Sequence, residues 1–523
     1  MTSMQRIRRR PTLALALAVI FSLGWIGCTQ MFRLPPLEGR SPSSGLSATA
    51  DTALGRAVAP QVAAHPGQSG IFPLADGHDA FAARLLLVRA AERTLDVQYY
   101  IWHRDLSGTL LFAALYQAAE RGVRVRLLLD DNNTAGLDDT LAALDAHPNI
   151  EVRLFNPFVV RRWRALAYLT DFPRLNRRMH NKSLTADNQL TIVGGRNIGD
   201  EYFGTGDHAL FVDLDALAVG PVAHDVSRDF ARYWASESAY PVDRLLRPVG
   251  PAAGAELLRA AETVSRQADA IPYLDAVAQR PLVRELIEHR LALIWAPTRL
   301  ISDDPAKGLG RATEDNLIGV RLKEALGAPQ AELTLVSPYF VPTRTGVATL
   351  GALARQGVKV RVLTNSLAAT DVAIVHAGYA KHRAALLAAG IELRELKPGF
   401  GSFGGRDHGL TGSSGSSLHA KTFAVDHARA FIGSFNFDPR SARLNTESGL
   451  VIESPALAGA IADAIAADPT GHAYRLRLDD RGRILWLEQS GGREIVHQAE
   501  PGAGFWRRAS IRFYSWLPIE WLL

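Results

Sequence analysis

The sequence predicts a duplicated α/β fold with two mixed, largely parallel sheets, each flanked by helices. Apolar, strand-like runs occur in pairs, at residues 95–101 and 334–340, 122–129 and 357–363, and 150–154 and 391–395. The members of the first pair lie 239 residues apart and those of the last pair 241. Stretches with helical apolar spacing separate the runs, and strands alternating with helices of about 10 to 15 residues indicate crossover units.

The first segment, residues 1–28, is predicted to be an export leader. Four arginines among the first ten residues precede the uncharged stretch 11–27, which gives a positive region followed by an apolar one. Trp-Ile-Gly-Cys, ending at Cys28, resembles the lipobox of bacterial lipoproteins, although leucine is usual where Trp25 stands. Lipid attachment at Cys28, retention as an N-terminal anchor and an incidental buried thiol stay open as alternatives. All three favour a bacterial cell-envelope protein that is membrane-associated and faces the periplasm.

The rest of the chain divides into five predicted segments. Residues 29–70 are rich in Pro, Gly, Ser and Ala and predict a flexible tether. The two repeated halves follow at 71–245 and 290–466, joined by a helical connector at 246–289. Residues 467–523 contain a predicted hairpin and a tail rich in tryptophan and arginine.

The charge balance argues against a broadly basic, nucleic-acid-binding protein. The net charge is +5, but residues 1–40 carry six arginines and one glutamate, so the other 483 residues balance at 52 positive and 52 negative groups. Cys28 is the only cysteine, which excludes an internal disulfide and any metal site that needs several cysteines.

One motif occurs in both halves. His180, Lys182 and Asp187 read H-x-K-x4-D, and 239 residues later His419, Lys421 and Asp426 repeat it. Because the chain has only 7 lysines, we expect such a match by chance roughly 0.01 times. An asparagine follows each motif lysine by 15 residues, and these are Asn197 and Asn436.

These residue types fit phosphodiester exchange. If the halves bring the histidines together, a neutral imidazole can attack phosphorus while a protonated one donates to the leaving alkoxide. The lysines and asparagines would bind the phosphate oxygens. Asp213 and Glu447 follow His180 and His419 by 33 and 28 residues, and each could orient an imidazole. We expect neither a metal nor a cofactor, because no metal-ligand spacing occurs and a lysine beside each histidine would repel a cation.

The paired motif resembles the phospholipase D superfamily, over about residues 71–466. The strings at 179–183, 194–202 and 517–520 are similar to the bacterial cardiolipin synthase branch, particularly its C type. The resemblance implies a duplicated phospholipase D fold with the active site between pseudo-twofold halves. It also implies a covalent phosphatidyl-histidine intermediate and transfer of the phosphatidyl group to phosphatidylglycerol, with phosphatidylethanolamine as an additional candidate lipid.

Roles within the motifs follow from the same resemblance. It makes His180 the nucleophile and His419 the acid and base, while the reverse assignment stays open because both motifs are intact. We count Asp187 and Asp426 among the motif's catalytic residues, but expect them to hold loop geometry rather than touch substrate.

Two other classes of function remain as alternatives. A phospholipase D-type phosphodiesterase would use the same residues to hydrolyse phospholipid or, less in keeping with the neutral body, nucleic acid. A non-catalytic, membrane-tethered binding protein fits least, because every candidate catalytic position in both halves is filled.

Three further segments border the predicted site. The first combines aromatic residues with Arg161, Arg162, Arg164, Arg174, Arg177 and Arg178. It predicts either a solvated helix face or a site for anionic lipid headgroups. Residues 505–523 hold three of the nine tryptophans, and Pro518 favours a tail packed over the site rather than one long docking helix. Residues 399–417, of which twelve are Gly or Ser, predict a mobile rim.

Aromatic residues also end the first strand-like run. At strand spacing we expect Tyr99, Tyr100 and Trp102 in the core, with the substrate entrance as the alternative.

Overall fold

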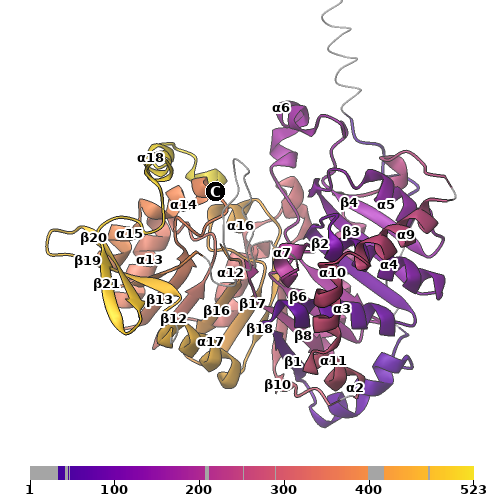
Figure 1. Cartoon of the computed structure of the whole chain (residues 1–523), viewed down its shortest axis with the longest axis horizontal. Helices are drawn as coiled ribbons and strands as arrows, with labels where there is room; N and C mark the ends of the chain where they lie inside the picture. Colours follow the sequence, from indigo (N-terminus) through magenta and orange to yellow (C-terminus); the bar gives the residue numbers. More distant parts are fainter. Residues whose placement is uncertain are drawn as a thin grey trace, which may run out of the picture.

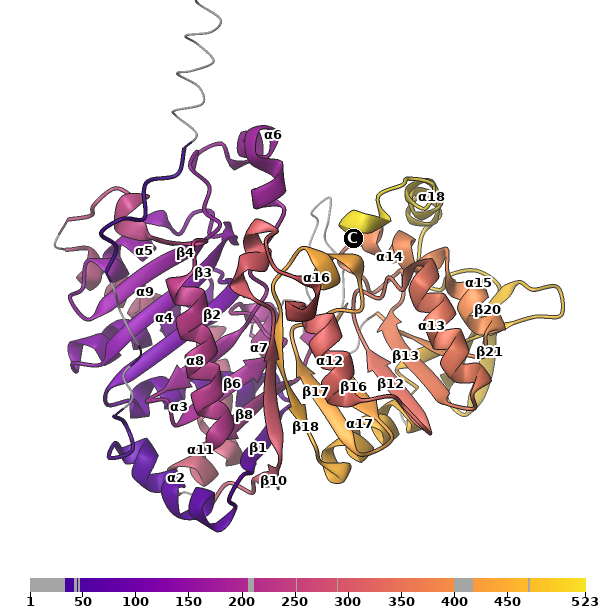
Figure 2. The same cartoon turned by 180° about the vertical axis from the view of Figure 1, so that it is seen from behind.

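The computed structural model describes residues 33–41, 45, 48–205, 211–250, 252–288, 290–398, 417–468 and 471–523. In it, two helix-flanked sheets lie side by side (Figure 1, and from behind in Figure 2). Cys28 and the whole predicted leader lie outside the described residues, as do residues 399–416 of the Gly/Ser-rich segment. Within the described ranges, no helix combines the length and apolar character needed to cross a membrane.

Each sheet keeps the sequence repeat in its strand order. The first runs through β10 (Ile294–Ala296), β1 (Ser69–Leu74), β8 (Asp215–Val219), β6 (Leu190–Gly194), β5 (Ser183–Ala186), β2 (Thr94–Ile101), β3 (Arg124–Asn133), β4 (Ile150–Phe155) and β9 (Ala239–Pro241). The second runs through β11 (Thr298–Ser302), β18 (Ser448–Ile452), β17 (Arg429–Gly433), β16 (Lys421–Val425), β12 (Glu332–Val336), β13 (Lys359–Asn365), β14 (Glu392–Leu396), β19 (Ala473–Leu478), β20 (Ile484–Ser490) and β21 (Arg493–His497). A short parallel pair, β7 (Phe211–Val212) and β15 (Ser417–Leu418), joins the two halves.

Helices cover both sheets. The first half has α3 (Gly77–Ala90), α4 (Leu106–Glu120), α5 (Asp138–Asp145), α6 (Arg164–Leu175), α7 (Asp200–Phe203), α8 (Pro221–Ala235) and the 3-10 turn η1 (Val242–Arg244). The second half has η2 (Pro305–Leu309), η3 (Glu314–Asn316), α12 (Ile318–Leu326), α13 (Thr343–Arg355), α14 (Ala373–Ala380), α15 (Arg383–Ala388), α16 (Pro439–Arg443) and α17 (Pro455–Ala467), and the tail adds α18 (Phe505–Tyr514) and η4 (Glu520–Leu522).

The prediction of largely parallel sheets is wrong, because most neighbouring strands are antiparallel. Among the described strands, the parallel runs within the sheets are β2–β3–β4 and β12–β13–β14. The strand after each motif histidine instead forms a hairpin, β5–β6 or β16–β17. Asp187 and Asp426 enter these turns with φ of 49° and 53°, as type I′ turns require. Such a turn reverses the chain, whereas a parallel pair needs a long crossover.

An apolar core lies between the two halves. It draws Val193, Ala216 and Ala218 from the first sheet together with Ala430, Ile432, Leu450 and other buried residues of the second. Strands β6 and β8 contact β17 and β18 there, and the alanines allow the backbones to approach closely. The hairpins that carry the two motifs therefore meet at this interface.

Part of the predicted flexible tether, 29–70, is ordered. It contains α2 (Ala53–Ala64), an alanine-rich helix whose Leu54 and Val58 pack against the first core. Upstream, Arg153 Nη2 donates to the carbonyl of Ser41 at 2.8 Å, and Arg40 Nη1 donates to that of Ser236 at 2.7 Å. Backbone carbonyls that accept from arginines fix this segment to the first half, a contact that composition alone does not indicate.

The connector and the C-terminal segment attach to different halves. The connector helices α9 (Ala253–Ser265), α10 (Ala270–Ala278) and α11 (Pro281–Ile287) pack on α3, α4 and α5. The predicted C-terminal hairpin pairs with β14 through β19, so it extends the second sheet. Conversely, β10 falls in the predicted second half but pairs with β1 of the first sheet.

Candidate active site

Each motif histidine is joined through its backbone to the opposite half. The His180 amide donates to the carbonyl of Thr446 at 2.8 Å, and the His419 amide donates to that of Val212 at 2.8 Å. The two acceptor residues directly precede Glu447 and Asp213. The pseudo-twofold arrangement therefore brings each histidine to a carboxylate from the other half.

The side chains complete two crossed pairs. His180 Nδ1 lies 2.8 Å from Oε2 of Glu447, and His419 Nδ1 lies 2.6 Å from Oδ2 of Asp213. Both imidazoles are 6% exposed, and both carboxylate residues are buried. A carboxylate that accepts the Nδ1 proton orients the ring and leaves Nε2 as the reactive nitrogen.

The two carboxylates are held in different ways. A side chain at Gly195 would place its Cβ 2.1 Å from Oδ1 of Asp213, so glycine is required for that close approach. The residue 239 positions later is Ser434, whose hydroxyl donates to Glu447. Ser441 donates to the other Glu447 oxygen at 2.7 Å. Sequence reasoning missed these serines, although the difference between the repeats at Gly195 and Ser434 was a usable signal.

The motif lysines face the same interior. Lys182 Nζ donates to the backbone carbonyl of His180 at 2.6 Å, and Lys421 Nζ donates to that of His419. Each lysine is 1% exposed, and neither forms an ion pair with a carboxylate among the described residues. Two buried ammonium groups beside two imidazoles form a receptor for an anion such as a phosphodiester.

Burial and mutual repulsion set the protonation of the cationic groups. Burial, then Lys182 and Lys421, lowers the pKa of His180 well below its usual value. Burial, then Lys421, lowers the pKa of His419 to about 4. Burial lowers the pKa of Lys182 to about 7 and that of Lys421 to about 8. A bound phosphate would restore the charged form of both lysines.

The two carboxylates differ in acidity. Burial raises the pKa of Glu447 to about 7, against the opposing effect of Lys182 and the two serines. Burial also opposes ionisation of Asp213, but the attraction of His419 and its hydrogen bond outweigh burial, and the pKa of Asp213 lies below its usual value. The carboxylate beside His419 is therefore the more firmly ionised.

The predicted phosphate ligands have unequal environments. Asn197 is fully buried, its Oδ1 accepts from the Ile101 amide at 3.1 Å, and its Nδ2 donates to the Tyr202 hydroxyl at 2.9 Å. It positions Tyr202, whose ring meets His419 edge-on at 5.2 Å. That Asn197 binds phosphate stays a prediction. Asn436 is buried, and only its Nδ2 could donate to a phosphate oxygen, because its Oδ1, which lacks a hydrogen-bond partner among the described residues, is an acceptor. Its role as a phosphate ligand stays a prediction.

The aromatic residues of β2 divide between core and site. Tyr99 and Trp102 are buried in the first core, as expected from their spacing. Tyr100 meets the His180 ring edge-on at 4.9 Å, and Lys182 Nζ lies 5.6 Å from the centre of its ring. It therefore lines the site beside the first motif.

The motif aspartates bind backbone amides, as residues that hold loop geometry would. Asp187 accepts from the amides of Glu92, Arg93 and Thr94 at 2.8 to 2.9 Å. Asp426 accepts from the amides of residues 330–332 in the same manner. Each lies at the far end of β5 or β16 from its histidine, seven residues along the chain, which spans at most about 23 Å. These carboxylates fasten the start of the neighbouring central strand.

We expect Asp187→Ala to lower the free energy of unfolding by about 3 kcal/mol, because three backbone amides lose a charged acceptor. Asp187 is fully buried, whereas Asp426 is only partly buried, so Asp426→Ala should cost less. Chemical denaturation measures both. A lost turnover with unchanged stability would instead show that these aspartates contact substrate.

The arginine cluster before the first motif faces mainly inward. Five of its six guanidinium groups are bound within the protein: Arg161 to Asp131 and Asp138, Arg164 to the Asp131 carbonyl, Arg174 to Asp171, Arg177 to the Arg443 carbonyl and Arg178 to Asp130. Arg162 is exposed. For most of the cluster, the prediction of either a solvated basic face or a basic headgroup site is thus wrong. Instead, several of these arginines hold α6 against the end of β3.

The end of the tail packs beside the site. The Arg440 amide donates to the carbonyl of Leu523 at 2.7 Å, and its guanidinium donates to Asn176 Oδ1 at 2.8 Å. Glu520 pairs with His382 at 2.6 Å and Lys381 at 3.0 Å. These contacts fix the last turn next to α16, which directly follows Asn436.

One cluster outside the active site contains atoms of the kind that bind metal ions. His103, Asp105 and Glu201 each bring one such atom within 4.8 Å of the others. Asp105 already caps α4 by accepting from the Gly108 amide at 2.9 Å, and its other oxygen accepts from the Asp200 amide at 2.7 Å. Helix capping accounts for this carboxylate.

Comparison with known proteins decides the family. The family described as "Cardiolipin synthase, PLD-like domain" matches residues 86–234 and 322–468. Cardiolipin synthase C of Escherichia coli (strain K12) is 54% identical over 471 residues, or 90% of this chain and 99% of that protein. The chain belongs to the phospholipase D-like cardiolipin synthase family. The resemblance predicted from the paired motifs is confirmed, and the chain is a member of an enzyme family.

Other members and neighbours of the cardiolipin synthase family are more distant. Cardiolipin synthase A of Pseudomonas entomophila (strain L48) is 26% identical over 423 residues, which cover 80% of this chain and 72% of that protein. The crystal structure of phosphatidylserine synthase from Haemophilus influenzae Rd KW20 superposes with a TM-score of 0.51 at 14% identity, covering 81% of this chain and 92% of that one. The latter confirms the duplicated fold class.

Proposed function

We propose that the protein is a phosphatidyltransferase that forms cardiolipin by moving a phosphatidyl group onto phosphatidylglycerol. The observation that carries the proposal is the pair of crossed histidine–carboxylate contacts beside two buried lysines. The 54% identical relative named cardiolipin synthase C supports this choice of product.

The first step forms a covalent intermediate. Nε2 of His180 attacks phosphorus of the donor lipid, the phosphorus–oxygen bond to the departing headgroup breaks, and the headgroup alkoxide takes a proton from His419. Lys182 and Lys421 balance the charge that builds on the phosphoryl oxygens. Glu447 stabilises the cation that develops on His180, because it accepts the Nδ1 proton.

The second step transfers the phosphatidyl group from His180 to the acceptor lipid. His419, now neutral, takes the proton from a glycerol hydroxyl of phosphatidylglycerol, and the resulting oxygen attacks the phosphorus of phosphatidyl-His180. The phosphorus–nitrogen bond breaks, which releases cardiolipin and restores both histidines. Water in place of the glycerol hydroxyl would give phosphatidic acid by the same route.

The assignment of roles rests on the different carboxylates. An imidazole that serves as acid needs a firmly ionised partner to hold its positive charge, and Asp213 supplies one to His419. Burial and the lysines lower the pKa of both histidines, so His180 is neutral, as a nucleophile must be. A bound phosphodiester anion would raise the pKa of His419 and let it carry the proton. The firmly ionised Asp213 beside His419 therefore favours His180 as nucleophile and His419 as acid and base.

The test is direct. Purified protein is incubated with phosphatidylglycerol, with and without phosphatidylethanolamine, and the lipid products are identified by mass spectrometry. Cardiolipin is the expected product, and added phosphatidylethanolamine shows whether a second donor is used. Phosphatidic acid alone would contradict transfer and identify a hydrolase.

The lysines predict a pH dependence. They bind phosphate as ammonium groups, which are present below their pKa values of about 7 and about 8. On a monomeric lipid substrate, kcat/KM should therefore fall as pH rises through 7 to 8. Lys182→Arg, which stays charged, should move this decline up to about 8, the pKa of Lys421. An unchanged profile in that variant would contradict the assignment.

We also propose that the protein is held at a membrane of the cell envelope, facing the periplasm, through its leader. The lipobox-like sequence at Cys28 supports lipidation, and the apolar stretch 11–27 equally fits an anchor. Intact-mass measurement of the membrane-extracted protein distinguishes diacylglycerol-linked Cys28 from a retained leader.

A further inference from the structure

We propose that the outer faces of α6 and α18 together form a docking surface for a phospholipid bilayer, on either side of the active site. The choice of lipid as the partner rests on the proposed function. The first face, the α6 patch, comprises Trp163, Leu166, Leu169 and Phe172. The second, the α18 patch, comprises Phe505, Trp506, Phe513 and Trp516.

Exposed apolar side chains concentrate in these two places. Among the described residues, thirteen large hydrophobic side chains are exposed, and nine of them belong to the two patches or to Trp521 just beyond α18. The other four, Ile271, Val320, Ile495 and Val496, lie elsewhere. Soluble surfaces rarely gather large apolar side chains in this way without a partner.

The α6 patch faces outward because the polar side of the helix is fixed. Leu169 is 83% exposed and Trp163 59%. On the opposite side, Arg161 and Arg164 bind Asp131, and Tyr168 donates to Asn132 at 2.8 Å. These polar contacts hold α6 against the end of β3, so its apolar side cannot turn inward without breaking them.

The α18 patch combines apolar and basic groups. Trp506 and Trp516 are 81% and 80% exposed. Arg508 and Arg512 are exposed without an ion-pair partner among the described residues, and both line a groove of about 850 Å³ with Phe505 and Trp516. Tryptophan beside unpaired arginine suits the boundary between headgroups and acyl chains of an anionic membrane.

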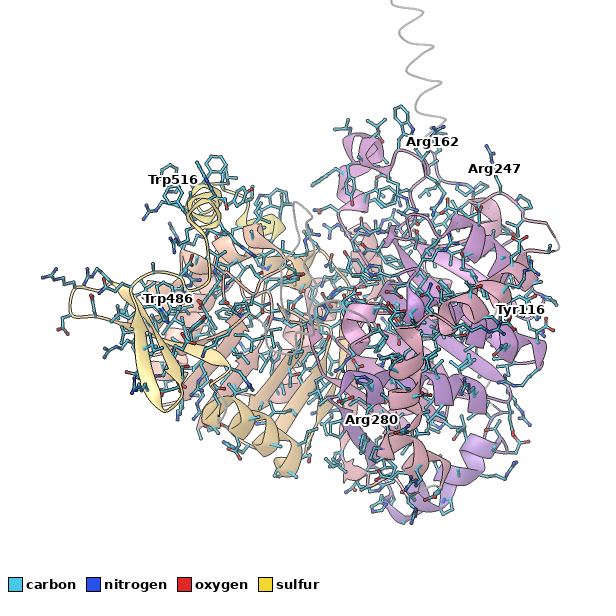
Figure 3. All side chains as sticks on the ribbon, viewed as in Figure 1. Tyr116, Arg162, Arg247, Arg280, Trp486 and Trp516 are labelled. Atoms are coloured by element: carbon cyan, nitrogen blue, oxygen red, sulfur yellow. The ribbon has the colours of Figure 1, made fainter. Side chains whose placement is uncertain are left out.

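The two patches lie at the same end of the molecule. Helices α6 and α18 lie at the top of the molecule in Figure 1 and, seen from behind, in Figure 2. Figure 3 labels Arg162 and Trp516 in the same upper region. Arg440 links the ends of both segments, since it binds Asn176 after α6 and the carbonyls of Leu522 and Leu523. Because α16, which contains Arg440, closely follows Asn436, the segments that carry the two patches meet beside the active site.

The beginning of the described chain favours the same orientation. In Figure 1 and Figure 2 the first described residues lie near α6. A leader or lipid that anchors the N-terminus would therefore bring α6 to the membrane first. Two aromatic patches and an anchor would define a plane, which fixes orientation better than one contact.

The experiment uses the full-length protein reconstituted in vesicles of phosphatidylethanolamine and phosphatidylglycerol. The acyl chains carry bromine, which quenches nearby tryptophan. We expect Leu166→Ser/Leu169→Ser and Phe505→Ser/Phe513→Ser, which retain every tryptophan, each to reduce quenching about twofold. Turnover on vesicles should fall about tenfold, with turnover of monomeric short-chain phosphatidylglycerol unchanged.

The matched control is Ile495→Ser/Val496→Ser, which removes two exposed apolar side chains from β21. It should leave both readouts as in the wild type. Equal quenching in the patch and control variants would overturn the proposal. Unquenched wild-type tryptophans, with a dimer that the patch variants dissociate, would assign the surface to a second copy. Quenching does not require turnover, so an inactive protein would refute the proposed function and leave this test intact.

Discussion

His180→Ala is expected to abolish both lipid transfer and lipid hydrolysis, with turnover reduced by at least about a thousandfold. The variant loses the nitrogen that attacks phosphorus, and neither lysine can replace it because both act as charged groups. His419→Ala should cost a similar factor on natural lipids, because an alkoxide is a poor leaving group without a proton donor. Product formation from phosphatidylglycerol, followed by mass spectrometry, measures both losses.

An activated substrate separates the two histidines. A phosphatidyl ester of p-nitrophenol loses p-nitrophenolate without protonation, so His419→Ala should release one equivalent in a burst and then stall as phosphatidyl-His180. His180→Ala should give no burst. His224→Ala, an exposed histidine on α8, is the control and should behave as the wild type. A burst in His180→Ala and none in His419→Ala would establish the reverse roles.

The sequence alone identifies the residues proposed to react, because the motif and its repetition can be read from residue spacing. Two H-x-K-x4-D motifs 239 residues apart point to His180, Lys182, His419 and Lys421 without any tertiary information. The crossing of the carboxylates was not predictable. It depends on backbone pairing between Thr446 and His180 and between Val212 and His419, which exists only once the halves pack through their shared core.

Other features also depend on contacts between distant residues. A run of arginines looks basic in sequence, but Asp131 and Asp138 neutralise much of it from a segment about 30 residues away. The prediction of largely parallel sheets was wrong partly because the residues around Asp187 do not stand out in the sequence as a hairpin turn. The composition of residues 53–64 predicts a flexible tether, but they form a helix that packs Leu54 and Val58 against the first core. Sequence patterns predict the candidate catalytic residues and many of the helices and strands. The hydrogen-bond and ion-pair partners of these residues depend on how the chain packs.

The crossed pairs give the second large prediction. Glu447→Gln and Asp213→Asn should each lower turnover about a hundredfold or more, because an amide cannot hold the positive charge on the imidazole beside it. Their behaviour toward the p-nitrophenyl ester should differ. Glu447→Gln should lose the burst, since Glu447 supports His180. Asp213→Asn should keep the burst and slow the following turnover, since Asp213 supports His419.

Each carboxylate variant should thus reproduce the defect of the histidine in the opposite half. A cycle of double variants checks this, because Glu447→Gln should add no further loss in a His180→Ala background but a full loss in His419→Ala. The neutral amides are nearly isosteric with the acids, so a thermal melt close to that of the wild type serves as the folding control. If Asp213→Asn abolished the burst and Glu447→Gln spared it, while His180→Ala still gave no burst, each carboxylate would serve the histidine of its own half, and the crossed geometry would be catalytically irrelevant.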